Sequence, residues 1–223
     1  MLLFLAGLRQ VQWLILCSLA FFLTACPDSS SITPTSLGVT IASPTIKTYT
    51  RGPATVHLTI TGTPDAVRLL RNDQPFITVI SPYEITFETG AWPEAPYAIK
   101  GRVVRGSEVV TSNPITLVVD RTAPVVTNRT PNQNQDGVAF NTSVTINFSE
   151  ALQPESLTSQ HIQVKRKFDN LPVPGNISTT PSGIVFSPQG LDRATQYQIE
   201  LNGFQDLAGN PLVSTNWSFA TSE

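Results

Sequence analysis

Side-chain oxygens that could hold a metal ion occur at Glu150, Asp206 and Asn210 in this chain of 223 residues. If residues 122–223 form a two-sheet sandwich, Glu150 ends a strand and Asp206 opens the loop between the last two strands, at the same end of the fold. Oxygen ligands gathered in this way are what a hard cation such as Ca²⁺ requires. Two carboxylates are few for calcium, and the sequence DLAGNP that begins at Asp206 is also an ordinary turn sequence. The sequence therefore leaves two interpretations, a calcium site or a plain turn, and predicts no other cofactor.

Groups for nucleophilic or acid–base catalysis are scarce. The chain has two histidines, His57 and His161, and its two cysteines both lie within the first 26 residues. A nucleophile and its base must meet within hydrogen-bond reach, whereas we expect the two histidines on the solvated surfaces of different modules. The sequence also lacks the GxSxG, HExxH, GxGxxG and P-loop patterns. We therefore predict that the protein is not an enzyme.

An apolar run precedes Cys26. The segment Val11–Ala25 carries no charge, follows Arg9 and ends in small residues, which is the layout of a secretory signal. At about 1.5 Å per helical residue the segment spans about 22 Å, less than the roughly 30 Å of a bilayer's hydrocarbon core. An uncleaved anchor that starts at Met1 is the alternative, although such an anchor would bury Arg9 in the bilayer.

The junction Leu23-Thr24-Ala25-Cys26 resembles the lipobox of bacterial lipoproteins, whose signal peptidase cuts before an acylated cysteine. The resemblance implies that residues 1–25 are a signal peptide and that Cys26 carries a lipid such as palmitate. It also implies a protein of the cell envelope, anchored on the exported side of the cytoplasmic membrane. Cys17 does not fit the box because bulky residues precede it. Residues 26–36 are polar after the cysteine and are expected to form a flexible tether.

Composition and charge indicate an exported all-β protein. The net charge is −2, and it becomes −3 without residues 1–25, whose one charged residue is Arg9. So mild a charge argues against nucleic acid as a partner. The remaining chain is rich in Thr, Ser, Val, Ile and Pro, which is typical of strands joined by turns. With no cysteine after Cys26, stability must come from core packing and not from disulfides.

Short strands with turn signals between them predict a β-sandwich over residues 37–121. In Val56–Ile60, for example, Val, Leu and Ile alternate with His57 and Thr59. The other strands expected here are Val67–Leu70, Phe76–Ile80, Tyr83–Phe87, Tyr97–Val103 and Ile115–Val119. Asp120–Pro124 ends this module, because a β-ladder cannot run through Pro124. A short, stiff linker of this kind predicts an elongated rod of two modules.

Residues 122–223 carry a series of motifs in a fixed order. NTxxxxxFSE begins at Asn141, Leu191 is followed by Tyr197 and its strand, DxAGN begins at Asp206, and a WSF strand begins at Trp217. That order resembles the bacterial Ig-like domain named from S-layer proteins, and residues 37–121 look like a different bacterial Ig-like type. The resemblance implies two tandem immunoglobulin-like β-sandwiches after the signal peptide and tether. Such modules serve as spacers, adhesion units and accessory domains, so the fold does not name a function.

Four aromatic residues have expected roles. Tyr97 and Tyr197 each lie early in a late strand, as in the tyrosine corner, in which the phenol packs inward and its hydroxyl bonds the backbone upstream. Trp217 shares a face with Phe219 and is expected in the core. Trp92, in an expected loop, is either a cap over the end of the core or a stacking platform for a saccharide.

These observations favour a non-catalytic, lipid-anchored envelope protein that acts as a structural spacer or an adhesion module. The alternative is a surface module that binds a glycan or peptidoglycan, with Trp92 as the contact. Expected partners are the membrane, through Cys26, and an envelope protein or polysaccharide. The open edges of a sandwich could also accept a strand from a partner protein.

Overall fold

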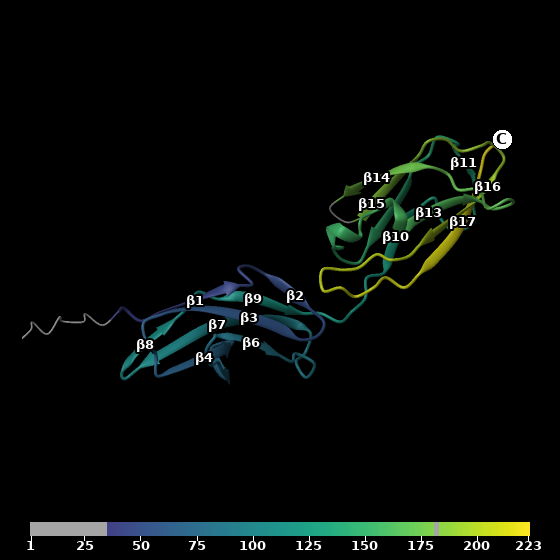
Figure 1. Cartoon of the computed structure of the whole chain (residues 1–223). Helices are drawn as coiled ribbons and strands as arrows, with labels where there is room; N and C mark the ends of the chain where they lie inside the picture. The colour runs from purple at the N-terminus through teal and green to yellow at the C-terminus, as the bar shows by residue number, and fades with distance from the viewer. Residues whose placement is uncertain (1–34, 181–182) are drawn as a thin grey trace, which may run out of the picture. The chain divides into compact units, whose positions relative to one another are not determined.

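The computed structural model describes residues 35–180 and 183–223, and these residues form β-strands joined by turns (Figure 1). Within them the helical elements are two short 3₁₀ turns, η1 (Pro154–Ser156) and η2 (Ser159–His161). No helix in the described ranges has the length and hydrophobicity needed to cross a bilayer. The all-β prediction is confirmed. The expected signal peptide and Cys26 lie outside the described residues.

The first module, residues 35–119, is built from two sheets. One sheet has the order β1-β3-β6, and the other has the order β2-β9-β7-β4-β5, with β8 pairing to β7. Strand β2 runs parallel to β9, and the other pairs of this module are antiparallel. Its strands are β1 (Gly38–Ser43), β2 (Thr48–Thr50), β3 (Ala54–Thr61), β4 (Ala66–Arg71), β5 (Gln74–Thr78), β6 (Glu84–Phe87), β7 (Ala95–Arg105), β8 (Glu108–Thr111) and β9 (Ile115–Val119).

Alternate residues of these strands fill the space between the two sheets. Val56 and Leu58 of β3 face Ile99 and Val103 of β7, and all four are almost fully buried in one core. Gly101, between the last two, has no side chain because a Cβ there would lie 2.8 Å from a methyl group of Val39. The period-two burial of apolar residues is what sets the register of these strands.

The second module, residues 120–223, has its own pair of sheets and a separate core. One sheet has the order β10-β12-β15-β14 and the other the order β11-β17-β16-β13, in which β11 runs parallel to β17. If β10 and β11 are counted as two halves of a first strand, these are the two sheets of a constant-type immunoglobulin domain. The strands are β10 (Val126–Thr130), β11 (Gln135–Val138), β12 (Val144–Phe148), β13 (Ile162–Arg166), β14 (Gly175–Thr180), β15 (Gly183–Pro188), β16 (Gln196–Leu201) and β17 (Thr215–Thr221).

Trp217 and Phe219 of β17 point into this second core, as predicted. They are 2% and 1% exposed, and Phe219 stacks on Tyr197 with ring centroids 5.5 Å apart. The indole Nε1 of Trp217 donates a hydrogen bond of 2.9 Å to the carbonyl oxygen of Pro131. This buried polar atom is therefore satisfied, as a core tryptophan requires.

Both expected tyrosine corners are present. The Tyr97 hydroxyl donates to the carbonyl oxygen of Pro93 at 2.9 Å. The Tyr197 hydroxyl instead accepts a hydrogen bond from the backbone N–H of Asp192 at 2.6 Å. Burial raises the pKa of Tyr197 above its ordinary value, so this phenol stays neutral over the physiological range.

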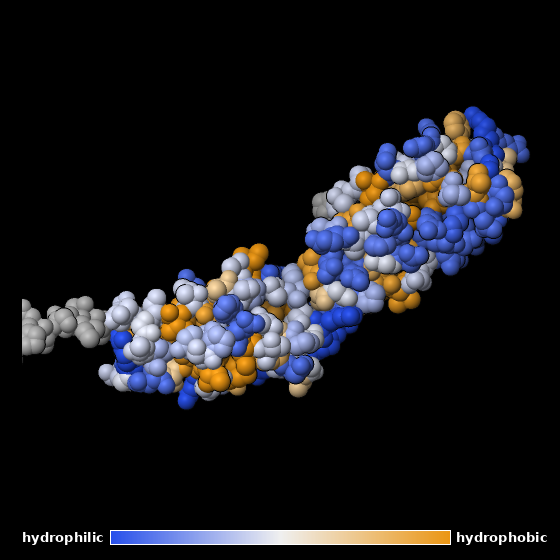
Figure 2. Space-filling model, viewed as in Figure 1, coloured by the Kyte–Doolittle hydropathy of each residue, from blue (hydrophilic) through white to orange (hydrophobic). Residues whose placement is uncertain are grey.

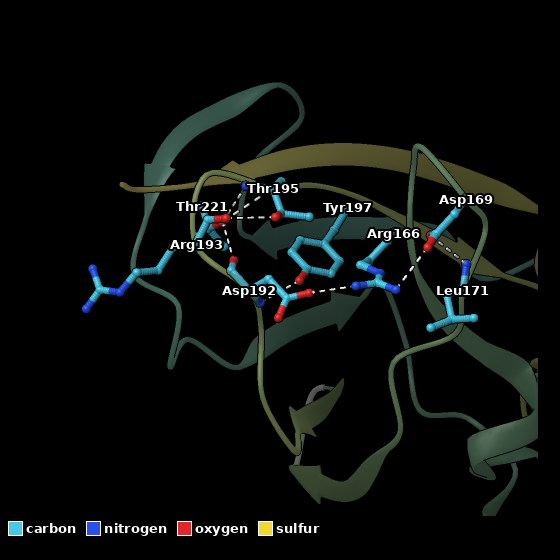
Figure 3. Close-up of polar contacts among 8 residues, drawn as sticks. All are labelled: Arg166, Asp169, Leu171, Asp192, Arg193, Thr195, Tyr197 and Thr221. Carbon is cyan, nitrogen blue, oxygen red and sulfur yellow. Dashed lines mark hydrogen bonds and ion pairs between the residues drawn. The ribbon is translucent and has the colours of Figure 1, made fainter.

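Polar contacts surround the corner of the second module (Figure 3). The Asp192 carboxylate accepts a hydrogen bond from Arg166 at 2.9 Å, and Arg166 also bonds Asp169 at the same distance. The Thr221 hydroxyl donates to the carbonyl oxygen of Asp192 at 2.7 Å. The loop before β16 is thus held to β13 by the ion pair of Asp192 with Arg166 and to β17 by the hydroxyl of Thr221.

Candidate functional site

Three carboxylates meet at one end of the second module. Asp120 directly follows β9, Glu150 lies two residues after β12, and Asp206 lies in the connection between β16 and β17. One carboxylate oxygen from each lies within 4.8 Å of the others. The structure therefore brings together Glu150 and Asp206, as the sequence predicts, and adds Asp120, which sequence reasoning missed.

Asp206 is fully buried and organises the turn that follows it. Its Oδ1 accepts hydrogen bonds of 2.8 Å from the backbone N–H groups of Ala208 and Asn210. Its Oδ2 accepts a further 2.8 Å bond from the Asn210 side-chain amide. Gly209 takes a φ of +84°, the left-handed conformation that glycine adopts without strain. Three donors compensate for the burial of the charge, so the turn interpretation accounts for Asp206.

Asn210 contributes its amide nitrogen to the cluster. Besides Asp206, Nδ2 lies 3.1 Å from the carbonyl oxygen of Asp120 and 3.3 Å from that of Thr122. The side chain is buried and holds the segment before β10 against the turn. A cation would need the oxygen of this amide, whereas the observed contacts use its nitrogen as a donor.

The surroundings of Glu150 change its protonation. Partial burial, and then the nearby charges of Asp120 and Asp206, raise its pKa above the ordinary value of 4.5. Repulsion between close carboxylates favours the protonated form of one of them. A divalent cation bound by Asp120, Glu150 and Asp206 would remove that repulsion. Calcium binding at this cluster stays a prediction.

Trp92 is half-buried against the core of the first module. Its ring stacks on Phe87 at 5.6 Å and meets the edges of Phe76 and Tyr97 at 5.5 and 5.0 Å. The Arg71 guanidinium lies 4.4 Å from the ring centroid. These contacts are those of a cap over the end of the core. A saccharide would have to stack on the part of the ring that these neighbours leave free, and its binding there stays a prediction.

The two histidines differ from each other. His57 of β3 is exposed, as expected. His161 was expected on the solvated surface, but it is half-buried, with Nδ1 2.7 Å from the carbonyl oxygen of Ser156 and its ring against Phe204. The expectation for His161 was wrong because its position beside Gly203 and Phe204 depends on the tertiary fold. Among the described residues, no hydrogen bond or ion pair joins either histidine to the acidic cluster or to a nucleophile.

A groove of about 440 Å³ lies beside β10. It is lined by Val125 and Val126 on one side and by Leu212 and Val213 on the other. Because β10 is the edge of its sheet, one side of the strand carries backbone groups that the sheet does not pair. The groove thus adjoins one of the edge strands of this module; β14, β11 and β13 are also edge strands of the described sheets.

Hydrophobic residues elsewhere on the surface are scattered. On the face shown in Figure 2 they gather in small patches between hydrophilic residues. Away from the groove, those that are most exposed, at 74–77%, are Ile46, Ile80 and Phe168. They belong to separate loops, and single exposed apolar residues are ordinary on globular proteins.

The sequence of the second module matches a known protein family. Residues 120–221 match the sequence profile of a family described as the bacterial Ig-like domain. This second module is similar to that domain. The match begins at Asp120, so the whole acidic cluster lies within it. A search of curated proteins found no match.

Solved structures with a related fold have low sequence identity. The N-terminal part of the bacterial S-layer protein SbsC is 14% identical, with a TM-score of 0.37 over 45% of this chain and 24% of that one. The fibronectin(III)-like modules of Clostridium thermocellum CbhA are 14% identical, with a TM-score of 0.41 over 83% and 94% of the two chains. Immunoglobulin domains 1–4 of Sidekick-1 are 13% identical, with a TM-score of 0.40 over 85% and 49%. The chain spans about a quarter of the SbsC fragment's length.

Proposed function

We propose that this protein is a lipid-anchored component of a bacterial cell envelope whose two sandwich modules act as a structural spacer or adhesion unit. The anchor is supported by the lipobox-like junction at Cys26. The bacterial surface is supported by the match of residues 120–221 to a bacterial Ig-like domain.

One observation carries the structural role. The polar and aromatic groups that could do chemistry are engaged in contacts that stabilise the fold. Asp206 and Asn210 bond their own turn, Tyr97 and Tyr197 bond the backbone, and Trp92 packs on the core. Such side chains position loops and strands, which suits a protein that presents surfaces to a partner. An interaction through the groove beside β10, by addition of an extended strand, fits the same role.

Replacement of the anchoring thiol tests this proposal. The variant Cys26→Ser removes the sulfur that would carry the lipid, and we expect the protein to move from the membrane fraction to the soluble exported fraction. The matched control Cys17→Ser changes the other cysteine of the same segment and should leave the protein in the membrane fraction. Mass spectrometry of the native protein should find an acylated amino-terminal Cys26. An intact Met1 with an unmodified Cys26 would overturn the anchor.

A further inference from the structure

A row of cationic and hydroxyl side chains crosses the outer face of the six-stranded sheet of the first module. Arg68 of β4 lies directly opposite Arg102 of β7. Thr78 of β5 lies opposite Arg68, and Thr111 of β8 lies opposite Arg102. The residues that flank the arginines on their strands, such as Leu69 and Val103, point into the core. The four side chains of the row therefore project from the face that looks away from it.

The two arginines lack an internal partner. Neither takes part in an ion pair or hydrogen bond of the described residues, and Nε of Arg102 is buried without an acceptor. Two other cations of this sheet are paired with acids, since Lys100 bonds Asp73 at 2.6 Å and Arg105 bonds Glu108 at 2.9 Å. Like charges directly opposite each other on adjacent strands destabilise a sheet. The row thus carries positive charge that the fold itself does not neutralise.

The side chains of the row are suited to a ligand that carries carboxylates and hydroxyl groups. A guanidinium binds a carboxylate through two parallel hydrogen bonds, and threonine hydroxyls both donate to and accept from sugar hydroxyls. Four adjacent strands place these groups along about 14 Å, since strands lie about 4.8 Å apart. A hollow of about 210 Å³ adjoins Arg68 at the edge of the sheet, lined also by Pro75, Phe76, Ile77 and Thr78.

We propose that this row, Thr78–Arg68–Arg102–Thr111, binds an acidic polysaccharide that carries carboxylates along its chain. An added peptide strand does not fit here, because β4 and β7 are hydrogen-bonded on both sides and the row offers only side chains. The binding activity goes beyond the spacer role and does not depend on the lipid at Cys26.

Binding of polygalacturonate to the full chain in detergent tests the proposal, with neutral dextran as the control ligand. We expect saturable binding of polygalacturonate that weakens as salt is added. The double variant Arg68→Gln/Arg102→Gln should weaken binding about tenfold or more. The matched control Arg51→Gln/Lys167→Gln makes the same change in net charge at two exposed cations away from the row, and it should bind like the wild type. A variant with lysine at both row positions keeps the charge but loses the paired hydrogen bonds, so it should bind with intermediate affinity.

The folding of the row variant provides an internal check. Because the arginines repel each other, the glutamine variant should melt at the same temperature as the wild type or higher. Equal weakening in the row variant and the control would show that only net charge matters and would overturn the site. Absence of polygalacturonate binding, or binding only to vesicles that contain phosphatidylglycerol, would also overturn the proposal.

Discussion

The two modules close the same corner of the same fold with different chemistry. In the first module the hydroxyl of Tyr97 donates to a backbone carbonyl, and the surroundings are aromatic, with Trp92 between Phe76 and Phe87. In the second module the hydroxyl of Tyr197 accepts from a backbone N–H, and the adjacent loop is held by ions and hydroxyls. What the two corners share is a buried phenol that bonds the backbone. The groups that support it are free to vary.

Replacement of a tryptophan, Trp217 or Trp92, should lower the free energy of unfolding more than the other substitutions below. Trp217→Ala removes a fully buried ring and its hydrogen bond to Pro131, and we expect a loss of about 3–5 kcal/mol in the free energy of unfolding. Trp92→Ala removes a half-buried ring, so a smaller loss of about 2 kcal/mol is expected. Urea unfolding of both variants measures the difference. Equal losses would contradict the view that Trp92 caps the core while Trp217 lies inside it.

Removal of the tyrosine hydroxyl at either corner should lower the free energy of unfolding by a smaller amount. Tyr197→Phe leaves the N–H of Asp192 without its acceptor, and we expect a loss of about 1–2 kcal/mol. Tyr97→Phe leaves only the carbonyl of Pro93, an exposed residue that water can reach, so the expected loss is about 0.5–1 kcal/mol. Thermal unfolding at matched conditions ranks the two variants. The reverse order would show that the direction of the hydrogen bond does not decide its contribution.

The smallest effect concerns Glu150, in the acidic cluster of the second module. The folded state holds the Glu150 proton more tightly than the unfolded chain does. The free energy of unfolding should therefore fall as the pH rises from about 4.5 through the raised pKa, and stay constant above it. Glu150→Gln should remove this fall and stabilise the protein at neutral pH by about 0.2–1 kcal/mol. Urea unfolding at a series of pH values measures both.

A calcium titration tests whether the three carboxylates bind a cation. Calcium chloride at about 1 mM, within the range that extracellular modules bind, is compared with sodium chloride of equal ionic strength. A rise in the melting temperature of the wild type that disappears in Glu150→Gln would establish a cation site at Asp120, Glu150 and Asp206. An unchanged melting temperature would remove the calcium hypothesis and leave the turn interpretation.

Local patterns made the centre of each sandwich predictable. Alternation of apolar residues in Val56–Ile60 identifies β3, and the spacing around Tyr97 and Tyr197 identifies both corners. Of the edge strands, β5 and β6 overlap the predicted Phe76–Ile80 and Tyr83–Phe87, whereas β2 and β14 were not predicted, because they are short or polar. In β14, for example, four of six residues are exposed, so no buried face marks the strand.

Contacts between distant parts of the chain were the other source of error. Asp120 was assigned to a linker, and nothing near it in sequence signals that it approaches Glu150 and Asp206. The row of Arg68 and Arg102 has a weak signal in the sequence, since Arg68 lies between the core residues Val67 and Leu69 and Arg102 directly precedes the core residue Val103. Only the pairing of β4 with β7 places them side by side. Lipidation at Cys26 stays a prediction from sequence alone.

The parallel pairing of β2 with β9 and of β11 with β17 has a mechanical consequence. In each module a strand near the start of the module lies alongside the module's last strand and points the same way. Tension applied through the two ends of the module therefore slides these strands past each other, and their hydrogen bonds resist together instead of opening one after another. A module stretched between a membrane and a moving partner would yield at high force, as single-molecule pulling can measure.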